Sequence, residues 1–393
     1  MKIINGIPVW GDPVDEGALR QIENAKEKGA AYAAMMADHH LGYAVPIGGV
    51  VAYEDAISPS GVGYDIACGN KAVRLDIPAA MIRNYIKPIM DTIWGALAFG
   101  VGRKNNTRVD HELFDDDGRW CLSAVAPHKE MARAQLGTIG SGNHYVDLFS
   151  DEEDRVWVGV HFGSRGLGHK IATYFLKAGG AQDGIDADPL VLGAFTTLGA
   201  DYLACMELAG RYAYAGRDWV CAEVARLLGA SIVEEVHNHH NYAWKEVHEG
   251  KHLWVVRKGA TPAFPGQRGF VGGSMGDCSV ILEGVESEES KQALYSTVHG
   301  AGRVMSRTQA RGKINRKTGE VIRPGEVSQE MMMGWIGKMG VELRGADTDE
   351  SPQAYKRLPE VLAHHATSVR ILHTLTPMGV AMAGEHEVDP YKD

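Results

Sequence analysis

The pattern of apolar and polar positions predicts helices and strands along the whole chain. Residues 14–36 carry apolar side chains at helical spacing and charged side chains on the opposite face, which predicts a helix. The segment 190–228 is rich in Ala and Leu and predicts two helices with a break near residues 216–218. Two further helices are predicted at 288–294 and 353–375.

Strands are predicted where apolar residues alternate with polar ones or form short runs. Residues 47–58 and 62–76 have the character of buried strands separated by turns, and shorter strands are predicted at 155–161 and 254–257. Strands and helices do not follow a regular βαβ rhythm, so the pattern predicts an α+β fold. Since no linker-like composition and no internal repeat divides the chain, we expect residues 1–393 to form a single domain.

Composition narrows the classes of function. The chain has 40 Lys and Arg against 50 Asp and Glu, a net charge of −10. This acidic balance argues against non-specific binding to polyanions such as nucleic acids, so an RNA substrate would have to be held in a localised basic groove. No apolar run reaches the roughly 18 residues that a membrane span requires, and the N-terminus lacks a signal pattern. We therefore expect a cytoplasmic protein. The five scattered cysteines argue against a disulfide scaffold.

The 17 histidines are clustered, and many of them lie in polar motifs at the ends of predicted strands. Five of six such motifs contain His, and most contain Gly beside it, which is difficult to explain by packing alone. Loops at strand ends are where rigid scaffolds place chemistry. The six motifs occupy residues 38–40, 61–69, 141–144, 161–166, 237–241 and 299–303.

Asp65 and Cys68 lie three residues apart in a glycine-bounded turn, so both side chains can face one point. A thiolate, a carboxylate and several imidazoles together are typical of a site for Mn²⁺, Zn²⁺ or Fe²⁺, and a thiolate can bridge two ions. The alternative for any single residue is structural, because a lone buried Cys usually fills a core. We assign seven histidines to packing or solvated roles: His39, His237, His239, His248, His364, His365 and His386.

Glycine-rich segments indicate backbone close to a phosphate. Residues 272–276 have the composition of a nucleotide cradle, although they match neither a Walker A loop nor a GxGxxG fingerprint. Residues 299–303 place an imidazole and a guanidinium beside flexible backbone, which a helix-entry turn explains equally well. Four basic residues are candidate phosphate ligands, each of which alone is more often a surface charge: Arg165, Lys258, Arg303 and Arg307.

Taken together, these motifs resemble those of the RtcB family of RNA ligases, and they occur in the family's order over most of the chain. The resemblance implies a single α+β domain around a dinuclear Mn²⁺ centre. Residues 355–377 also resemble the family's closing helix. The matching segments are 36–42, 59–74, 136–148, 161–172, 239–248, 256–263, 272–281 and 299–310.

The resemblance also implies an activity. Members of this family use GTP to join an RNA 3′-phosphate or 2′,3′-cyclic phosphate end to a 5′-hydroxyl end, in tRNA splicing or RNA repair. By the family's pattern, His299 takes GMP as a phosphoramidate and passes it to the RNA 3′-phosphate. Archaease proteins activate some members, and nothing in this sequence requires or excludes such a partner.

The site residues that the resemblance implies fall into three sets. One metal ion would be bound by Asp65, Cys68 and His144, and the other by Cys68, His161 and His240. Phosphate groups and catalysis would involve His299, Arg165, Arg303, Lys258 and Asn143. The segments around GMP would comprise Asn143, Tyr145, Val146, Asp147, Asn241, Gly272, Gly273, Ser274, Met275, Ser279, Gly300, Ala301 and Gly302.

The chain departs from the family's pattern in the part that reads the base. Asp147 stands where Glu is typical, and Met382 and Ala383 stand where a terminal Lys would contact guanine. These changes leave two alternatives open beside a ligase. One is a metal-dependent cyclic phosphodiesterase or phosphatase acting on RNA ends, and the other is a non-catalytic RNA-binding paralogue. The intact motif around His299 argues against the first, although the loss of the terminal Lys favours it. The intact set of Asp, Cys and His ligands argues against the second.

Overall fold

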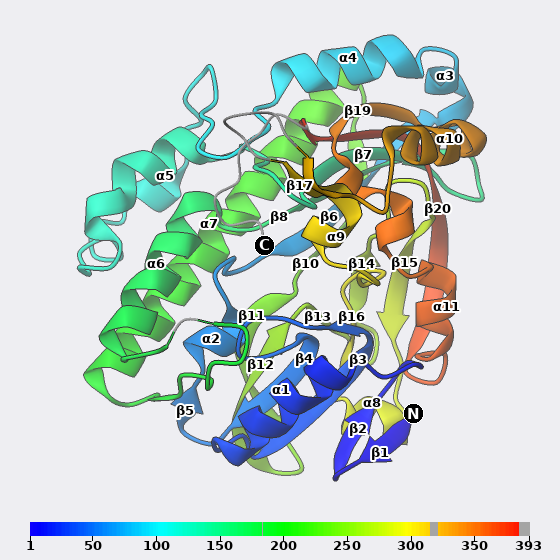
Figure 1. The fold of residues 1–393 in the computed structure, drawn as a ribbon. Helices are drawn as coiled ribbons and strands as arrows, with labels where there is room; N and C mark the ends of the chain where they lie inside the picture. The colour runs from blue at the N-terminus through cyan, green and yellow to red at the C-terminus, as the bar shows by residue number, and fades with distance from the viewer. Residues whose placement is uncertain (183, 315–320, 385–393) are drawn as a thin grey trace.

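The computed structural model describes residues 1–182, 184–314 and 321–384 and has mixed helix and sheet architecture (Figure 1). Six described strands form one sheet, in the order β1 (Lys2–Ile4), β2 (Ile7–Val9), β3 (Tyr32–His40), β4 (Ile47–Tyr53), β12 (Lys251–Lys258) and β11 (Asn241–His248). A larger sheet has the order β10 (Ile232–His239), β6 (Gly69–Pro78), β8 (Arg155–Phe162), β7 (Tyr145–Ser150), β20 (Val369–Gly384), β15 (Ser279–Gly284) and β14 (Arg268–Val271).

Short strand pairs complete the sheet structure. β19 (Glu342–Ala346) runs parallel to β20 in the larger sheet. The pair of β13 (Ala260–Pro262) and β16 (Ser296–Val298) lies between the two sheets, because β13 contacts both β4 and β10. The remaining pairs are β17 (Gly312–Ile314) with β18 (Val321–Pro324), and β5 (Ala56–Ile57) with β9 (Leu192–Gly193).

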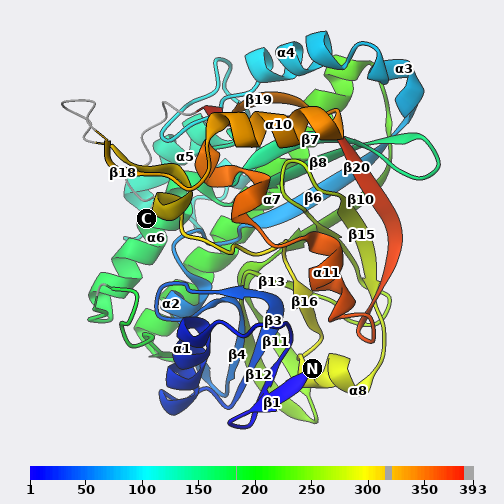
Figure 2. The same ribbon diagram turned by 45° about the vertical axis from the view of Figure 1, so that its right-hand side comes forward.

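Helices surround the sheets. Figures 1 and 2 show α6 and α7 side by side along one flank, with α4 and α1 at opposite ends of the molecule. Across the described ranges, no helix combines the length and apolarity that crossing a membrane requires. The α-helices are α1 (Glu16–Glu27), α2 (Pro59–Val62), α3 (Ala79–Arg83), α4 (Ile86–Ala96), α5 (Lys129–Gln135), α6 (Arg165–Ala178), α7 (Thr197–Leu228), α8 (Glu288–Gln292), α9 (Arg307–Arg311), α10 (Gln329–Met339) and α11 (Leu358–Ala363). The 3₁₀ helices are Glu112–Phe114, Ala126–His128, Thr348–Glu350 and Pro352–Ala354.

The larger sheet buries apolar side chains on both faces. Val158 packs with residues of α4 and α7 on one face, while its neighbour Trp157 packs with Phe270 on the other. A strand sends successive side chains to opposite faces, so a sheet covered on both sides requires the nearly continuous apolar runs that this sequence contains. The two covered faces hold the strands rigidly, and their ends carry the polar motifs.

The α+β prediction is confirmed, and the strands predicted around 47–58, 155–161 and 254–257 are present as β4 with β5, β8 and β12. The helix predicted at 288–294 is present as α8. The strand predicted at 62–76 begins later, at Gly69, because the preceding residues form a tight turn.

Three helix predictions need correction. α1 ends at Glu27, and β3 begins at Tyr32 within the predicted 14–36, because Gly29 adopts a φ of +104° and residues from Tyr32 onward pair with β4. The predicted break at 216–218 is absent from α7, where Gly216 packs closely against Phe162 and Arg217 is buried. In the segment 353–375 only α11 is an α-helix. β20 starts at Val369 and pairs with β15 and β7, an example of tertiary pairing overriding local helical pattern.

Helix α10 provides a test of these backbone assignments. Gly334 is exposed in its interior with no atom near its missing Cβ, so Gly334→Ala is expected to raise the free energy of unfolding by about 1 kcal/mol. Gly340 ends the same helix at a φ of +68°, so Gly340→Ala is expected to lower it by about 1 kcal/mol. Urea unfolding of both variants checks the prediction, and equal effects would contradict it.

Candidate active site

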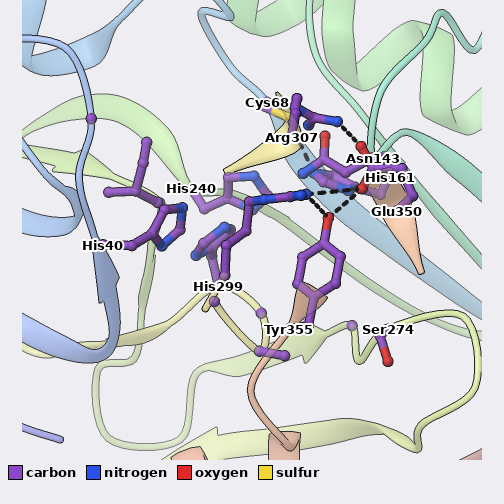
Figure 3. A pocket seen from close by; sticks show the side chains of 18 of the residues that line it. His40, Cys68, Asn143, His161, His240, Ser274, His299, Arg307, Glu350 and Tyr355 are labelled. Carbon is purple, nitrogen blue, oxygen red and sulfur yellow. Dashed lines mark hydrogen bonds and ion pairs between the residues drawn. The ribbon is translucent and has the colours of Figure 1, made fainter. Parts of the chain in front are cut away.

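The ends of strands from both sheets meet around a cavity of about 610 Å³ (Figure 3). The smaller sheet contributes residues at the ends of β3 and β12, and the larger sheet contributes residues of β6, β7, β8 and β20. The loops that precede or follow these strands complete the wall. Residues distant in the sequence are therefore brought to one place by the meeting of the two sheets.

The turn from Asp65 to Cys68 is fixed by its backbone. The Cys68 amide donates to the Asp65 carbonyl oxygen at 3.0 Å, and Ala67 adopts a φ of +61°. The amide of Ala67 donates to the Asn241 carbonyl oxygen, and the amide of His240 donates to the Cys68 carbonyl oxygen. This reciprocal pairing fixes His240 next to the turn.

Two candidate ligand groups share Cys68. One contains Cys68, His161 and His240, the other contains Asp65, Cys68 and His144, and within each group the ligand atoms lie within 4.8 Å of one another. The Cys68 Sγ atom is 3.2 Å from His161 Nε2 and 3.6 Å from His144 Nε2. The predicted metal residues thus converge in two sets with a common thiol, an arrangement that suits two adjacent ions.

Backbone carbonyl groups orient two of the imidazoles. His144 Nδ1 lies 3.1 Å from the Ile139 carbonyl oxygen, and His161 Nδ1 lies 3.0 Å from the Asn143 carbonyl oxygen. For His161, a proton on Nδ1 satisfies the Asn143 carbonyl group and leaves Nε2 with a lone pair. Fixing the tautomer through the second nitrogen is the usual arrangement for metal-binding histidines.

The electrostatic environment fits a cation. Burial lowers the pKa of His161 and of His240 well below the usual value, so both imidazoles are neutral, as ligation requires. Burial and then the Asp65 charge raise the pKa of the Cys68 thiol, an effect that a nearby divalent ion offsets. Burial opposes ionisation of Asp65, but the hydrogen bond and charge of His144 hold its pKa at about 2. In the described part of the chain, the buried Nδ1 of His240 has no hydrogen-bond partner, which leaves it available to an ion.

Arg217 fixes the segments that carry three of these ligands, a role that the sequence did not reveal. Its buried guanidinium donates to the Ala67 and Phe162 carbonyl oxygens, at 3.1 and 2.5 Å, and lies 2.9 Å from His239 Nδ1. Each of these partners is the direct neighbour of a ligand in the first group: Cys68, His161 and His240. An arginine in the middle of a helix gave no signal of this contact.

His299 is oriented by Asp38, another residue whose role the sequence did not reveal. The two side chains meet at 2.6 Å between His299 Nδ1 and Asp38 Oδ2, and the His299 and Gly300 amides donate to the same oxygen. Burial opposes ionisation of Asp38, but its contacts with His299 hold its pKa below the ordinary value. The Asp38 carboxylate is therefore placed to accept a hydrogen bond from the Nδ1–H of His299, which leaves Nε2 as the other ring nitrogen. The available signal was the polar motif at 38–40.

Three of the residues predicted to bind the nucleotide lie on strand β7, and their side chains point to opposite faces of the sheet. Tyr145 and Asp147 line the cavity, whereas Val146 points to the opposite face and packs in the apolar core. Across the described residues, Tyr145 Oη and Asp147 Oδ1 are buried without a hydrogen-bond partner, and burial raises the pKa of both groups. Met382 of β20 lies in the wall beside them. This part of the cavity is suited to a polar planar group that supplies the missing hydrogen bonds.

The glycine-rich segments approach the other walls closely. A Cβ on Gly272 would lie 2.1 Å from Tyr145 Oη, and a Cβ on Gly302 would lie 2.3 Å from the Asp38 carbonyl oxygen, so neither position admits a side chain. Ser279 does not line the cavity but accepts from the Gly273 amide, and Asn241 accepts from the Gly259 amide. The cavity wall also includes Asn143, Ser274, Met275, Gly300 and Ala301.

The predicted basic residues lie in different surroundings. Lys258 lines the cavity and donates to the Tyr43 and Ser60 carbonyl oxygens, and burial lowers its pKa to about 7. Arg165 does not line the cavity and lies behind His144, 3.1 Å from its Nδ1. Arg303 lines the cavity but donates to Tyr355 Oη and to the Asp349 carbonyl oxygen.

The histidines assigned to structural roles lie outside the cavity wall where they are described. His39 and His365 accept hydrogen bonds from the Asp15 and Ala37 amides, and His248 lies 2.7 Å from a carboxylate oxygen of Glu246. His386 lies outside the described residues. His237, His239 and His364 also lie away from the wall, whereas His40, which had no assigned role, lines it.

Comparison with known proteins gives a consistent result. The family model described as tRNA-splicing ligase RtcB matches residues 21–383. An RNA-splicing ligase RtcB1 from Escherichia coli is 31% identical over 94% of this chain and 95% of its own length. The tRNA-splicing ligases RtcB of Archaeoglobus fulgidus and Thermococcus kodakarensis are 31% and 32% identical, over 94% and 89% of this chain and 91% and 87% of theirs.

The shared thiol generates a prediction about metal binding. We expect the wild-type protein to bind two Mn²⁺ ions, and Cys68→Ser to weaken binding at least about tenfold at both positions, because one soft ligand is removed from both groups. Isothermal titration calorimetry measures stoichiometry and affinity. Cys121→Ser, at an exposed cysteine, is the matched control and should bind like the wild type. Two tight ions in Cys68→Ser would rule out a shared ligand.

Proposed function

The chain belongs to the RtcB family, and we propose that it is an RNA ligase that uses GTP and two Mn²⁺ ions to join 3′-phosphate or 2′,3′-cyclic phosphate ends to 5′-hydroxyl ends. The observation that carries the proposal is the position of His299 beside the ligand groups. Its ring centroid lies 4.9 Å from that of His240, and Asp38 holds its Nδ1. A histidine whose Nδ1–H is held by a carboxylate, so that Nε2 can attack, next to a metal centre is the arrangement that phosphoryl transfer to histidine requires.

His299 acts as the nucleophile in this proposal. Its Nε2 attacks the α-phosphorus of GTP, a nitrogen–phosphorus bond forms, and pyrophosphate leaves. A 2′,3′-cyclic phosphate end is first opened by water, which leaves a 2′-hydroxyl and a 3′-phosphate. An oxygen of the RNA 3′-phosphate then attacks the same phosphorus, which transfers GMP to the RNA and restores the imidazole. Finally the 5′-hydroxyl oxygen attacks the 3′-phosphate phosphorus and GMP leaves. Throughout, Asp38 keeps the proton on Nδ1 and stabilises the positive charge on the ring.

The metal residues support this chemistry. Asp65, Cys68 and His144 would hold one ion, and Cys68, His161 and His240 the other. Bound divalent ions would hold phosphate oxygens in place and neutralise the charge that develops on them. The chain's own contribution is to keep the imidazoles of His161 and His240 neutral and the Asp65 carboxylate ionised at neutral pH.

Asp147 is proposed to read guanine. Guanine offers two neighbouring N–H donors, and a buried carboxyl group with an unpartnered oxygen is a matching acceptor. Adenine lacks this donor pair, so it would leave the carboxyl group unsatisfied at a cost of about 1–3 kcal/mol. Because Met382 lies where the family places a lysine, this preference depends on Asp147 more than it does in relatives with both groups.

The remaining expectations belong to the same proposal. They are a single domain over residues 1–393, a cytoplasmic location, cleaved tRNA or other RNA as substrate, and, as for some family members, activation by archaease. The two alternative functions differ from a ligase in a measurable way. A cyclic phosphodiesterase or phosphatase would release or open the terminal phosphate without covalent nucleotide transfer, and a binding paralogue would do neither.

Covalent labelling tests the nucleophile. We expect radiolabelled GTP with Mn²⁺ to label the wild-type protein, and His299→Ala to abolish the label. Asp38→Asn should slow labelling at least about a hundredfold, because the amide no longer enforces the Nδ1 proton. The adduct should be lost in acid and stable in base, as a phosphoramidate is.

The exposed histidine variant His364→Ala is the control for that experiment and should label normally. Labelling that persists in His299→Ala would move the nucleophile elsewhere. An unlabelled wild type that still opens a cyclic phosphate would favour the phosphodiesterase alternative.

Base choice is tested by competition between GTP and ATP. We expect the wild type to label with GTP in preference to ATP by about tenfold to a hundredfold. Asp147→Glu should strengthen the preference by restoring about 1.5 Å of reach, while Asp147→Asn should weaken it. Labelling rates with each nucleotide provide the measurement. Equal use of both nucleotides in all three proteins would show that Asp147 does not read the base.

A further inference from the structure

A group of arginine and acidic side chains forms part of the cavity wall. Glu350 is 3% exposed and accepts from Arg307 through one carboxylate oxygen and from Tyr355 through the other (Figure 3). Asp349 is fully buried, and its Oδ2 lies 3.3 Å from Arg307 Nη1. We call Glu350, Asp349 and Tyr355 the carboxylate clamp. Its residues come from one short segment that follows β19.

Arg303 and Arg307 both line the cavity, but they differ in how many of their N–H groups the surrounding residues use. Arg303 donates from Nε to the Met305 carbonyl oxygen, from Nη1 to Tyr355, and from Nη2 to the Asp349 carbonyl oxygen. Its Nη1 also lies 3.4 Å from Glu350. A guanidinium has five N–H donors, and these contacts use four of them. Arg303 therefore mainly links its own loop to the segment that contains Asp349 and Tyr355, and it has little capacity left to bind an anion.

Arg307 is held by one nitrogen only in this group. Both of its contacts with the clamp are made by Nη1, whereas Nη2 points to the loop that contains Asn143. A Cβ built on Gly142 would lie 3.5 Å from Arg307 Nη2. Asn143 and Arg307 both line the cavity, so the guanidinium spans the distance from the clamp to this loop.

From this geometry we propose that Glu350 is a positioning residue that aims the Arg307 guanidinium at a phosphate group bound beside Asn143. The inference rests on the proposed function and deepens it, because it assigns a subsite for the phosphate of the RNA end or of the nucleotide. An arginine fixed by a carboxylate on one edge presents its other edge with little loss of side-chain entropy. The clamp also balances the charge of the arginines in a wall where an unpaired guanidinium would be costly.

The two phosphate sources are separated by paired ligands. Fluorescence anisotropy gives the affinity of a short RNA with a 3′-phosphate relative to the same RNA with a 3′-hydroxyl. Calorimetry gives the affinity of GTP relative to guanosine. Glu350→Gln keeps the size of the side chain but removes its charge, so it is expected to reduce one of these phosphate preferences about tenfold. The preference that falls identifies the phosphate.

A double-mutant cycle distinguishes positioning from general destabilisation. If Glu350 acts through Arg307, the double variant Glu350→Gln, Arg307→Gln should bind phosphate no more weakly than Arg307→Gln alone. Asp347→Asn is the matched control: Asp347 lies on the same segment and pairs at 3.4 Å with Arg311, which does not line the cavity. It should leave both preferences unchanged. Thermal unfolding of each variant monitors folding.

The possible results distinguish between the positioning role of Glu350, the phosphate subsite and the ligase activity. Additive losses in the cycle, or unchanged preferences in Glu350→Gln, would overturn the positioning role and leave the ligase proposal intact. A wild type without either preference would overturn the subsite itself. A wild type that shows the preference, loses it through Arg307 and yet joins no RNA ends would support this inference and contradict the proposed function.

Discussion

The active site depends on one buried guanidinium. Arg217 extends from the middle of α7 and bonds to the residues next to Cys68, His161 and His240. A buried positive charge is costly unless acceptors surround it, so these segments must be in their native places for the arginine to be buried. The same bonds that stabilise the charge therefore fix the ligand geometry.

The surroundings of the cavity assign a protonation state to each group. Burial keeps His161 and His240 neutral, whereas hydrogen bonds and nearby charges keep Asp38 and Asp65 ionised against the same burial. These opposite outcomes arise because each carboxylate has a histidine partner within 3.0 Å. Histidines thus serve in two ways, as neutral ligands of a cation and as the partner that keeps a carboxylate charged.

Local pattern predicted the parts of the fold that local forces control. The strand at 155–161 and the helix at 288–294 follow from alternation and from amphipathic spacing. The segment from Val369 could not be predicted in this way, because β20 exists through its pairing with β15 and β7, far away in the sequence. The continuity of α7 across Gly216 likewise depends on close packing against Phe162.

The sequence by itself determined the family, the chemical types of the ligands and the candidate nucleophile, because residue identity and motif order are properties of the chain. The tertiary structure decided which of these side chains meet. It brought Asp38 to His299, placed Val146 in the core and Arg165 behind His144, and paired Arg307 with Glu350. Such contacts join segments separated by many residues, and only the packing of the two sheets, which no local pattern encodes, sets their distances.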